Sequence, residues 1–355
     1  CKYYICNLNA LTLPESLEKI GIYAFCNNSS LKSVNIPAKV KTIGERAFSS
    51  CGLTGLVIQE GVQAIGNYAF ERNSLQNLTL PSTITSIGGS AFGENSNLQS
   101  IICNAVTPPT LGENAIGSSV KEIKVPISSI AAYKQANGWK NFTNYYGGEV
   151  INNGITYRIN EKEAMVAAAE ATLTEANIPS AVEFGGNQYA VIKINEKVFS
   201  GNTNLTVVTL PDGLVEIGNY AFSGCQNLES VAFPESLTTL GDYAFSSCKS
   251  LKTIKIPSGV TTIHERCFCG CSSLESVTIP EGVMTIGLFA FKSCNLKALT
   301  LPESLEKIGD CAFYDNRSLK SVNIPAKVKT IGKQAFYDCG LTELVIPEGV
   351  QTIDN

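Results

Sequence analysis

Thirteen cysteines give this 355-residue chain most of its obvious chemical potential. Thiolates bind soft metal ions, form disulfides or act as nucleophiles, and the run CFCGC places Cys267, Cys269 and Cys271 within five residues. A structural zinc site usually draws its ligands from two such clusters, and no second cluster follows this run. We therefore predict no metal site and no cofactor.

The chain has a single histidine, His264. One histidine excludes sites that need two, and it argues against a hydrolytic triad. His264 stands where related segments of the chain have glycine, and we interpret it as a substitution at an exposed edge. The alternative is a titrating switch. With no catalytic grouping elsewhere, we predict that the chain is not an enzyme.

Six of the thirteen cysteines follow a regular spacing, each three residues after a phenylalanine. Side chains at equivalent places in a stack of coils lie about 5 Å apart and point the same way. A vertical disulfide needs side chains that face each other, so we favour buried free thiols that pack as small apolar residues. The positions are Cys51, Cys225, Cys248, Cys271, Cys294 and Cys339, and we expect Cys6 to join them.

An Ala-Phe pair recurs every 22 or 23 residues and defines a repeat. Around it each unit reads L-x-x-V/L-x-I/L-P-x-x-V/L-x-x-I-G-x-x-A-F-x-x-C. The alternation before the proline predicts a short strand, and a second extended piece leads to the Ile-Gly corner. We expect glycine there to allow a tight turn and the Ala-Phe segment to be a short helical or 3-10 turn. Such units bury their apolar positions only by stacking.

These residues resemble the leucine-rich repeats of BspA-type bacterial surface proteins. The resemblance covers Leu8 to about Ser119 and Val191 to Asn355. It implies an α/β leucine-rich-repeat solenoid, right-handed, built of short parallel strands and arranged as two tandem arrays.

The repeat is interrupted between the two arrays. We assign residues 1–148 to the first array, with coils over 8–119 and a C-terminal cap over 120–146. In this cap we expect a helical stretch near 128–135 and a plug formed by Trp139. Residues 149–355 form the second array, with an N-terminal cap over 149–192 and coils over 193–355. Within 149–192, GGN predicts a hairpin, whereas the Ala-rich run EAMVAAAEATLTE is compatible with helix or strand.

A longer duplication links the two arrays. Residues 299–355 match residues 11–67 at about three positions in four without a gap, far more than ordinary repeats match each other. We expect that the parent protein repeats a whole capped domain, and that the chain begins within one copy and ends, truncated, within the next.

Composition limits the partners. A net charge of −4 with no long Lys/Arg run gives no electrostatic footprint for nucleic acid. No apolar run approaches the length of a membrane-spanning helix. We predict neither nucleic-acid binding nor a membrane span within the chain.

The outward positions of the repeated strands form the candidate binding surface. They are small, polar and almost uncharged, which is equally compatible with a solvated surface that has no ligand. In the second array they include Ser230, Thr253, Lys255, Ser276, Thr278, Thr300, Ser321 and Asn323. Tyrosines near the Ala-Phe segments are further possible contacts, at Tyr68, Tyr220, Tyr243, Tyr314 and Tyr337.

The resemblance implies a non-enzymatic protein at the cell surface or outside the cell. BspA-type proteins are associated with adhesion to host matrix proteins such as fibronectin and fibrinogen, and with coaggregation. The alternative is a structural spacer or stalk in a larger surface protein, with no ligand of its own.

Overall fold

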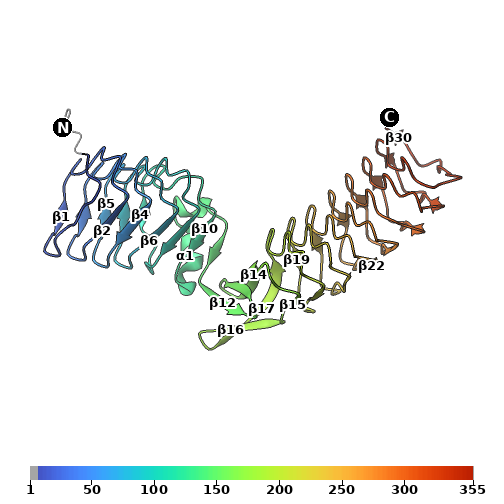
Figure 1. The fold of residues 1–355 in the computed structure, drawn as a ribbon, viewed down its shortest axis with the longest axis horizontal. Helices are drawn as coiled ribbons and strands as arrows, with labels where there is room; N and C mark the ends of the chain where they lie inside the picture. The colour runs from blue at the N-terminus through green and yellow to red at the C-terminus, as the bar shows by residue number, and fades with distance from the viewer. Residues whose placement is uncertain (1–6, 355) are drawn as a thin grey trace. The chain divides into compact units, whose positions relative to one another are not determined.

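A computed structural model describes residues 7–354. The chain divides into two compact units, Cys1–Gly148 and Glu149–Asn355, each built of stacked coils (Figure 1). A typical coil has two short strands, one before the proline and one before the corner glycine. Equivalent strands pair in parallel, so two ladders run along each unit.

In the first unit, the corner strands form one five-stranded parallel sheet. These are β1 (Lys19–Ile20), β3 (Thr42–Ile43), β5 (Ala64–Ile65), β7 (Ser86–Ile87) and β9 (Thr110–Leu111). The strands before the prolines form the other ladder, in which β2 (Ser33–Ile36) pairs with β4 (Gly55–Ile58). On the same side, β6 (Asn77–Leu80), β8 (Ser100–Cys103), β10 (Glu122–Lys124) and β11 (Tyr145–Tyr146) form a separate four-stranded parallel sheet.

The second unit begins with a mixed sheet in the order β12, β13, β14, β17, β19, β21, with β16 paired to β17. The Ala-rich run is strand β14 (Glu163–Ala169), held between β13 (Ile155–Ile159) and β17 (Asn187–Ile194). Pairing on both edges outweighs the helix propensity of alanine. The predicted hairpin is confirmed, because β16 (Ala181–Phe184) pairs antiparallel with β17 across Gly185-Gly186. Strand β12 spans Gly148–Asn152.

Regular coils then complete the second unit. Their strands before the prolines are β15 (Glu175–Asn177), β18 (Val207–Thr209), β20 (Ser230–Val231), β22 (Thr253–Lys255), β24 (Ser276–Thr278), β26 (Leu299–Thr300) and β28 (Val322–Asn323). Their corner strands are β19 (Glu216–Ile217), β21 (Thr239–Leu240), β23 (Thr262–Ile263), β25 (Thr285–Ile286), β27 (Lys307–Ile308), β29 (Thr330–Ile331) and β30 (Thr352–Ile353).

The Ala-Phe segments form a third side of each unit, which we call the turn wall. They are hydrogen-bonded turns rather than the expected short helices, because the residue before each Ala has left-handed backbone angles, as at Tyr68 with φ 58°. Their N–H groups donate to the following coil instead. Tyr68 N–H donates to Gly89 O at 2.9 Å and Phe70 N–H to Ala91 O at 2.8 Å.

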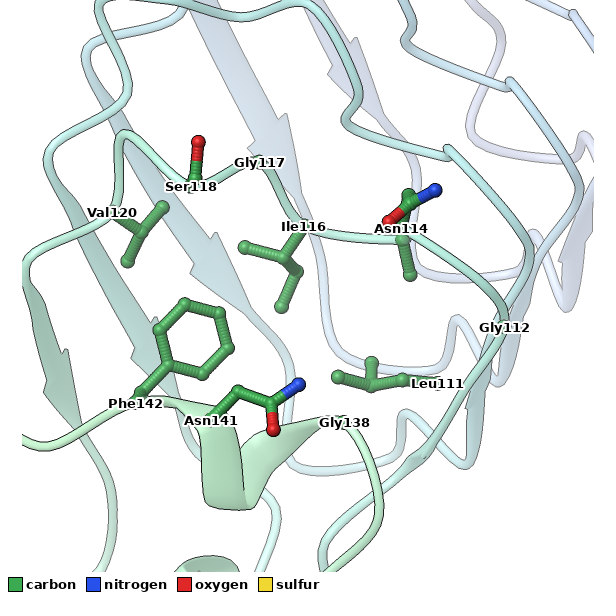
Figure 2. Close-up of a pocket in the computed structure, with 11 residues that line it drawn as sticks. Leu111, Gly112, Asn114, Ile116, Gly117, Ser118, Val120, Gly138, Asn141 and Phe142 are labelled. Atoms are coloured by element: carbon green, nitrogen blue, oxygen red, sulfur yellow. The ribbon is translucent and has the colours of Figure 1, made fainter.

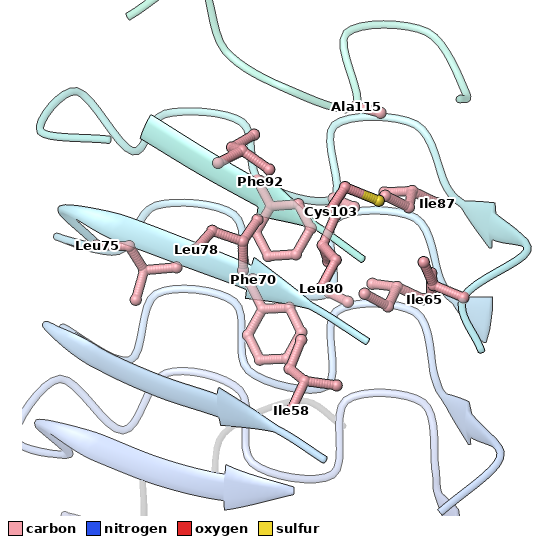
Figure 3. Close-up of a cluster of buried hydrophobic side chains, with 14 of the residues drawn as sticks. Ile58, Ile65, Phe70, Leu75, Leu78, Leu80, Ile87, Phe92, Cys103 and Ala115 are labelled. Atoms are coloured by element: carbon pink, nitrogen blue, oxygen red, sulfur yellow. The ribbon is translucent and has the colours of Figure 1, made fainter. Parts of the chain in front are cut away.

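The phenylalanines of the turn wall form the centre of the core. Phe48, Phe70 and Phe92 are fully buried, and neighbouring rings stack with centroids 5.4 Å apart. Figure 3 shows Phe70 and Phe92 among the inward aliphatic residues of both ladders. Each large apolar side chain buried in this way contributes roughly 1.5–3 kcal/mol. The stack therefore ties each coil to the next.

The corner glycines have a different role from the one expected. They lack the positive φ that glycine alone adopts easily. Instead, a Cβ at Gly66 would lie 2.7 Å from Glu45 N and 2.8 Å from Gly44 C of the preceding coil. At corners such as Gly66, glycine avoids a clash because the backbone of the preceding coil lies too close for a Cβ, whereas the coil of His264 accepts a side chain there.

After β10, the chain forms η1 (Ile127–Ser129), the helix α1 (Ile130–Gln135) and η2 (Trp139–Asn141). Trp139 and Tyr133 are fully buried and contact each other edge to face, with centroids 5.0 Å apart. The indole N–H donates to Pro109 O at 2.7 Å, and the Tyr133 hydroxyl donates to Ala105 O at 2.8 Å. These bonds attach the helical segment to the preceding coil.

Candidate interaction surfaces

The outward strand positions of the second unit form an exposed surface, which we call the strand face. All eight side chains proposed from the sequence are exposed, and buried residues such as Ile254 and Val277 alternate with them. The charge of Lys255 is paired, since its Nζ lies 3.0 Å from Glu235 Oε1 of the preceding coil. The strand face thus presents hydroxyl and amide groups with little free charge.

A second surface lies on the turn wall of the same unit, where aromatic rings and cations stack in sequence. Neighbouring members lie 4.4–5.4 Å apart, measured between ring centroids or from the cationic atom to the centroid. We call this the cation–aromatic row, and its members are Lys197, Tyr220, Tyr243, Arg266, Phe289, Lys292, Tyr314 and Tyr337.

The centre of this row is ordered by polar contacts as well as stacking. The Arg266 guanidinium lies 5.2 Å from the Tyr243 ring and 4.4 Å from the Phe289 ring. The Tyr243 hydroxyl donates to Glu265 Oε1 at 3.2 Å, and Arg266 Nη1 lies 2.5 Å from the same oxygen. Side chains already held in one geometry lose less conformational entropy when a partner binds. Four of the five tyrosines noted in the sequence have a cation over their rings, and they are Tyr68, Tyr220, Tyr243 and Tyr314.

Five of the repeated cysteines are buried inside the turn wall, as predicted, whereas Cys339 is only half-buried. Cys225 and Cys271 are fully buried, and burial raises the pKa of each thiol to about 12. The eleven cysteines among residues 7–354 are free, whereas Cys6 lies outside the described residues. These thiols stay protonated at neutral pH, so they pack in the core and are poor nucleophiles and metal ligands.

Asparagine shares the cysteine position in other coils, which the sequence analysis overlooked. Asn73 and Asn316 also lie three residues after a phenylalanine and are buried. Asn316 Nδ2 donates to Phe291 O and Phe313 O, both at 2.8 Å, and so links two coils. These asparagines could have been found from the sequence, because they have the same offset from the Ala-Phe pair as the cysteines.

The CFCGC run and His264 do not form a common site. Cys267 and Cys271 are fully buried, and Cys269 is only half-buried. His264 is partly exposed at its corner, with Nδ1 3.7 Å from Asp242 Oδ1. Within residues 7–354, no group of three His, Cys, Asp or Glu side chains is placed to hold a metal ion. Over the same residues, none of the helices is long and apolar enough to cross a membrane.

The repeat is characteristic enough to identify the family. The sequence profile of the BspA type leucine rich repeat region matches residues 1–125, 192–315 and 244–355. The chain belongs to the BspA-type leucine-rich repeat family. No curated protein sequence matches this family member.

Several solved structures resemble this BspA-type chain. A leucine-rich repeat protein from Eubacterium ventriosum is 24% identical, with 92% of this chain and 81% of that chain covered and a TM-score of 0.49. A leucine rich cell surface protein from Faecalibacterium prausnitzii is 22% identical, with 86% and 69% covered and a TM-score of 0.36. A leucine rich repeat protein from T. pallidum is 26% identical, with 58% and 86% covered and a TM-score of 0.43.

Proposed function

We propose that the chain is a non-enzymatic binding segment of a bacterial surface or secreted protein, with protein partners that include host matrix proteins. Membership of the BspA-type family supports the location and the class of partner. The observation that carries binding is the cation–aromatic row. Tyrosine and arginine are the residues that most often anchor protein interfaces, and here they are exposed in part and already ordered.

We also propose the strand face as a contact surface. Its residues alternate with buried ones over β20 to β26 and with the half-buried Val322 in β28, so hydroxyl and amide groups recur from strand to strand. Ser230, Ser276 and Thr278 are small enough to let a partner backbone approach closely. Lys255 offers a cation, although Glu235 already neutralises it.

Binding can be tested by surface plasmon resonance of the full chain over immobilised fibronectin and fibrinogen. A Tyr243→Ser/Arg266→Ser variant removes the centre of the cation–aromatic row, and Ser230→Glu/Ser276→Glu places charge on the strand face. The matched control Gln226→Glu/Ser272→Glu adds the same charge at exposed positions of the same two coils. We expect saturable binding that the control preserves and at least one test variant weakens. Absence of saturable binding to both proteins would contradict the adhesion proposal.

A spacer role is the second candidate, and the strand face favours it. A surface of Ser, Thr and Asn with paired charges suits a solvated stalk that has no ligand. In the same experiment, a spacer predicts no binding for the wild-type chain or any variant.

We further infer that residues 120–146 close the first array and residues 149–192 open the second. The buried Trp139 and its bond to Pro109 support the first assignment. The pairing of β17 with β14 and β19 supports the second. Separate expression of residues 1–148 and 149–355 tests both, because each capped piece should show cooperative unfolding.

A further inference from the structure

The phenylalanine stack of the first unit ends at a hollow in the turn wall. Phe92 pairs with Ile116 in the next coil, and Phe92 N–H donates to Ala115 O at 2.9 Å, so Ile116 takes the place of the next ring. Beyond Ile116, the helical segment replaces a regular coil. A cavity of about 340 Å³ remains between the two, lined by residues 111–112, 114–118 and 120 and by Gly138, Asn141 and Phe142 (Figure 2).

Apolar side chains form part of the lining of this cavity, and polar side chains and backbone form the rest. In Figure 2, Leu111, Ile116, Val120 and Phe142 point towards its centre, and the Asn141 amide lies at the rim. Ile116 and Phe142 are only half-buried, unlike the fully buried phenylalanines of the earlier coils. The cavity has the size of a small ligand pocket, and the four apolar side chains on one part of its lining suit an apolar side chain or ring.

The cavity also has backbone donors. In earlier coils, the N–H groups of the residue before Ala and of Phe donate to carbonyls of the following coil, as Tyr68 and Phe70 do. Asn114 and Ile116 hold these two places, and Asn114 has the same left-handed φ, 51°. Among residues 7–354, no acceptor is bonded to the N–H of Asn114 or Ile116. In earlier coils, these N–H groups point towards the next coil. Here the helical segment takes that place, and its residues Gly138, Asn141 and Phe142 line the cavity.

We propose that this cavity binds a short peptide segment of a partner protein. Two of its backbone carbonyls, from alternate residues, accept the N–H groups of Asn114 and Ile116. The large apolar side chain of the residue after the second carbonyl packs on Ile116, Val120 and Phe142. The coils of the first unit support this choice of ligand, because the same row of donors is satisfied there by a polypeptide with Ala-Phe at its centre. A bound segment gives these donors acceptors other than water.

The probe is the peptide acetyl-Asn-Tyr-Ala-Phe-Glu-Arg-amide, which copies residues 67–72, titrated into the full chain. The readout is the amide chemical shifts in heteronuclear NMR. We expect saturable shifts of the Asn114 and Ile116 amides. A peptide with Ala in place of Phe should bind about tenfold more weakly, since it loses the apolar contact. Lack of shifts at these amides, or equal affinity of the two peptides, overturns the proposal. Equal shifts with benzoate alone also overturn it, because they indicate a site for small carboxylates.

Two variants separate binding from stability. Ile116→Phe extends the stack into the cavity, so we expect about tenfold weaker peptide binding and an unchanged or higher midpoint of thermal unfolding. Asn141→Trp covers the rim from an exposed position and should block the peptide without touching the core. Val57→Phe is the control, because Val57 occupies an exposed outward strand position of the first unit, away from the cavity. This variant should bind the peptide as wild type does. Wild-type affinity in both blocking variants overturns the proposal.

Discussion

The thiol of Cys271 donates a hydrogen bond to the carbonyl oxygen of Phe245 in the preceding coil, with 3.2 Å between Sγ and O. The same bond recurs at Cys225, Cys248 and Cys294, with distances of 3.1–3.2 Å. Each carbonyl also accepts the backbone N–H of the residue three positions further on, as Phe245 O does from Cys248, so the thiol is its second donor. The cysteine ladder therefore links successive coils by polar contacts as well as by packing.

Replacement of this thiol should show whether its donor matters. Cys271→Val keeps an apolar side chain of similar size but removes the thiol donor, so the Phe245 carbonyl keeps only the Cys248 N–H and we expect a loss of about 0.5–1.5 kcal/mol in the free energy of unfolding. Cys271→Asn should lose less, because Asn316 makes the equivalent bonds in another coil. Urea denaturation followed by circular dichroism measures both. Equal stability of Cys271→Val and wild type would contradict the prediction.

The buried thiols should also make stability depend on alkaline pH. Burial raises the pKa of Cys225 and Cys271 from 9.0 to about 12, so the folded chain keeps protons that the unfolded chain releases. This stabilisation is fully present below pH 9 and is lost as the pH rises towards 12. Urea midpoints measured across this window should fall, and less steeply in Cys225→Ala/Cys271→Ala. If the urea midpoints of the two proteins fall equally with pH, groups other than these two thiols cause the loss of stability at alkaline pH.

Substitution of a corner glycine should destabilise the stack by overpacking. In Gly66→Ala, the new Cβ meets Glu45 N and Gly44 C at less than 3 Å, and we expect a loss of about 1–3 kcal/mol. Gly213→Ala is the matched control, since no atom lies within 4 Å of its Cβ position and its φ is ordinary. The control should be neutral or stabilising by up to about 1 kcal/mol. Similar losses in the two variants would argue against the close-approach explanation.

Tryptophan fluorescence offers a local probe, because Trp139 is the single tryptophan and is fully buried in the first unit. Phe70 belongs to the same hydrophobic cluster. Phe70→Ala should lower the free energy of unfolding by about 3–5 kcal/mol and shift the fluorescence transition to lower urea. Val57→Ala, at an exposed strand position, should leave that transition in place.

The sequence alone predicted the parts of the molecule that depend on residue type and spacing. The Ala-Phe period predicted stacked coils, and the alternation before each proline predicted which side chains of β22 and β24 point outwards. The constant offset of Cys271 and its equivalents from phenylalanine predicted a ladder of buried thiols. These features depend on residues within one repeat, and the same pattern recurs in every repeat, so the sequence predicts them repeatedly.

Other features arise only where coils meet. Contact between coils explains the corner glycines such as Gly66, the left-handed backbone before each Ala and the strand conformation of Glu163–Ala169. The free N–H groups beside Ile116 and the cavity next to Phe142 exist because a helical segment follows where another turn of the wall would lie. Sequence period fixes what each coil contains, whereas backbone distances between coils decide which groups are crowded, paired or left open.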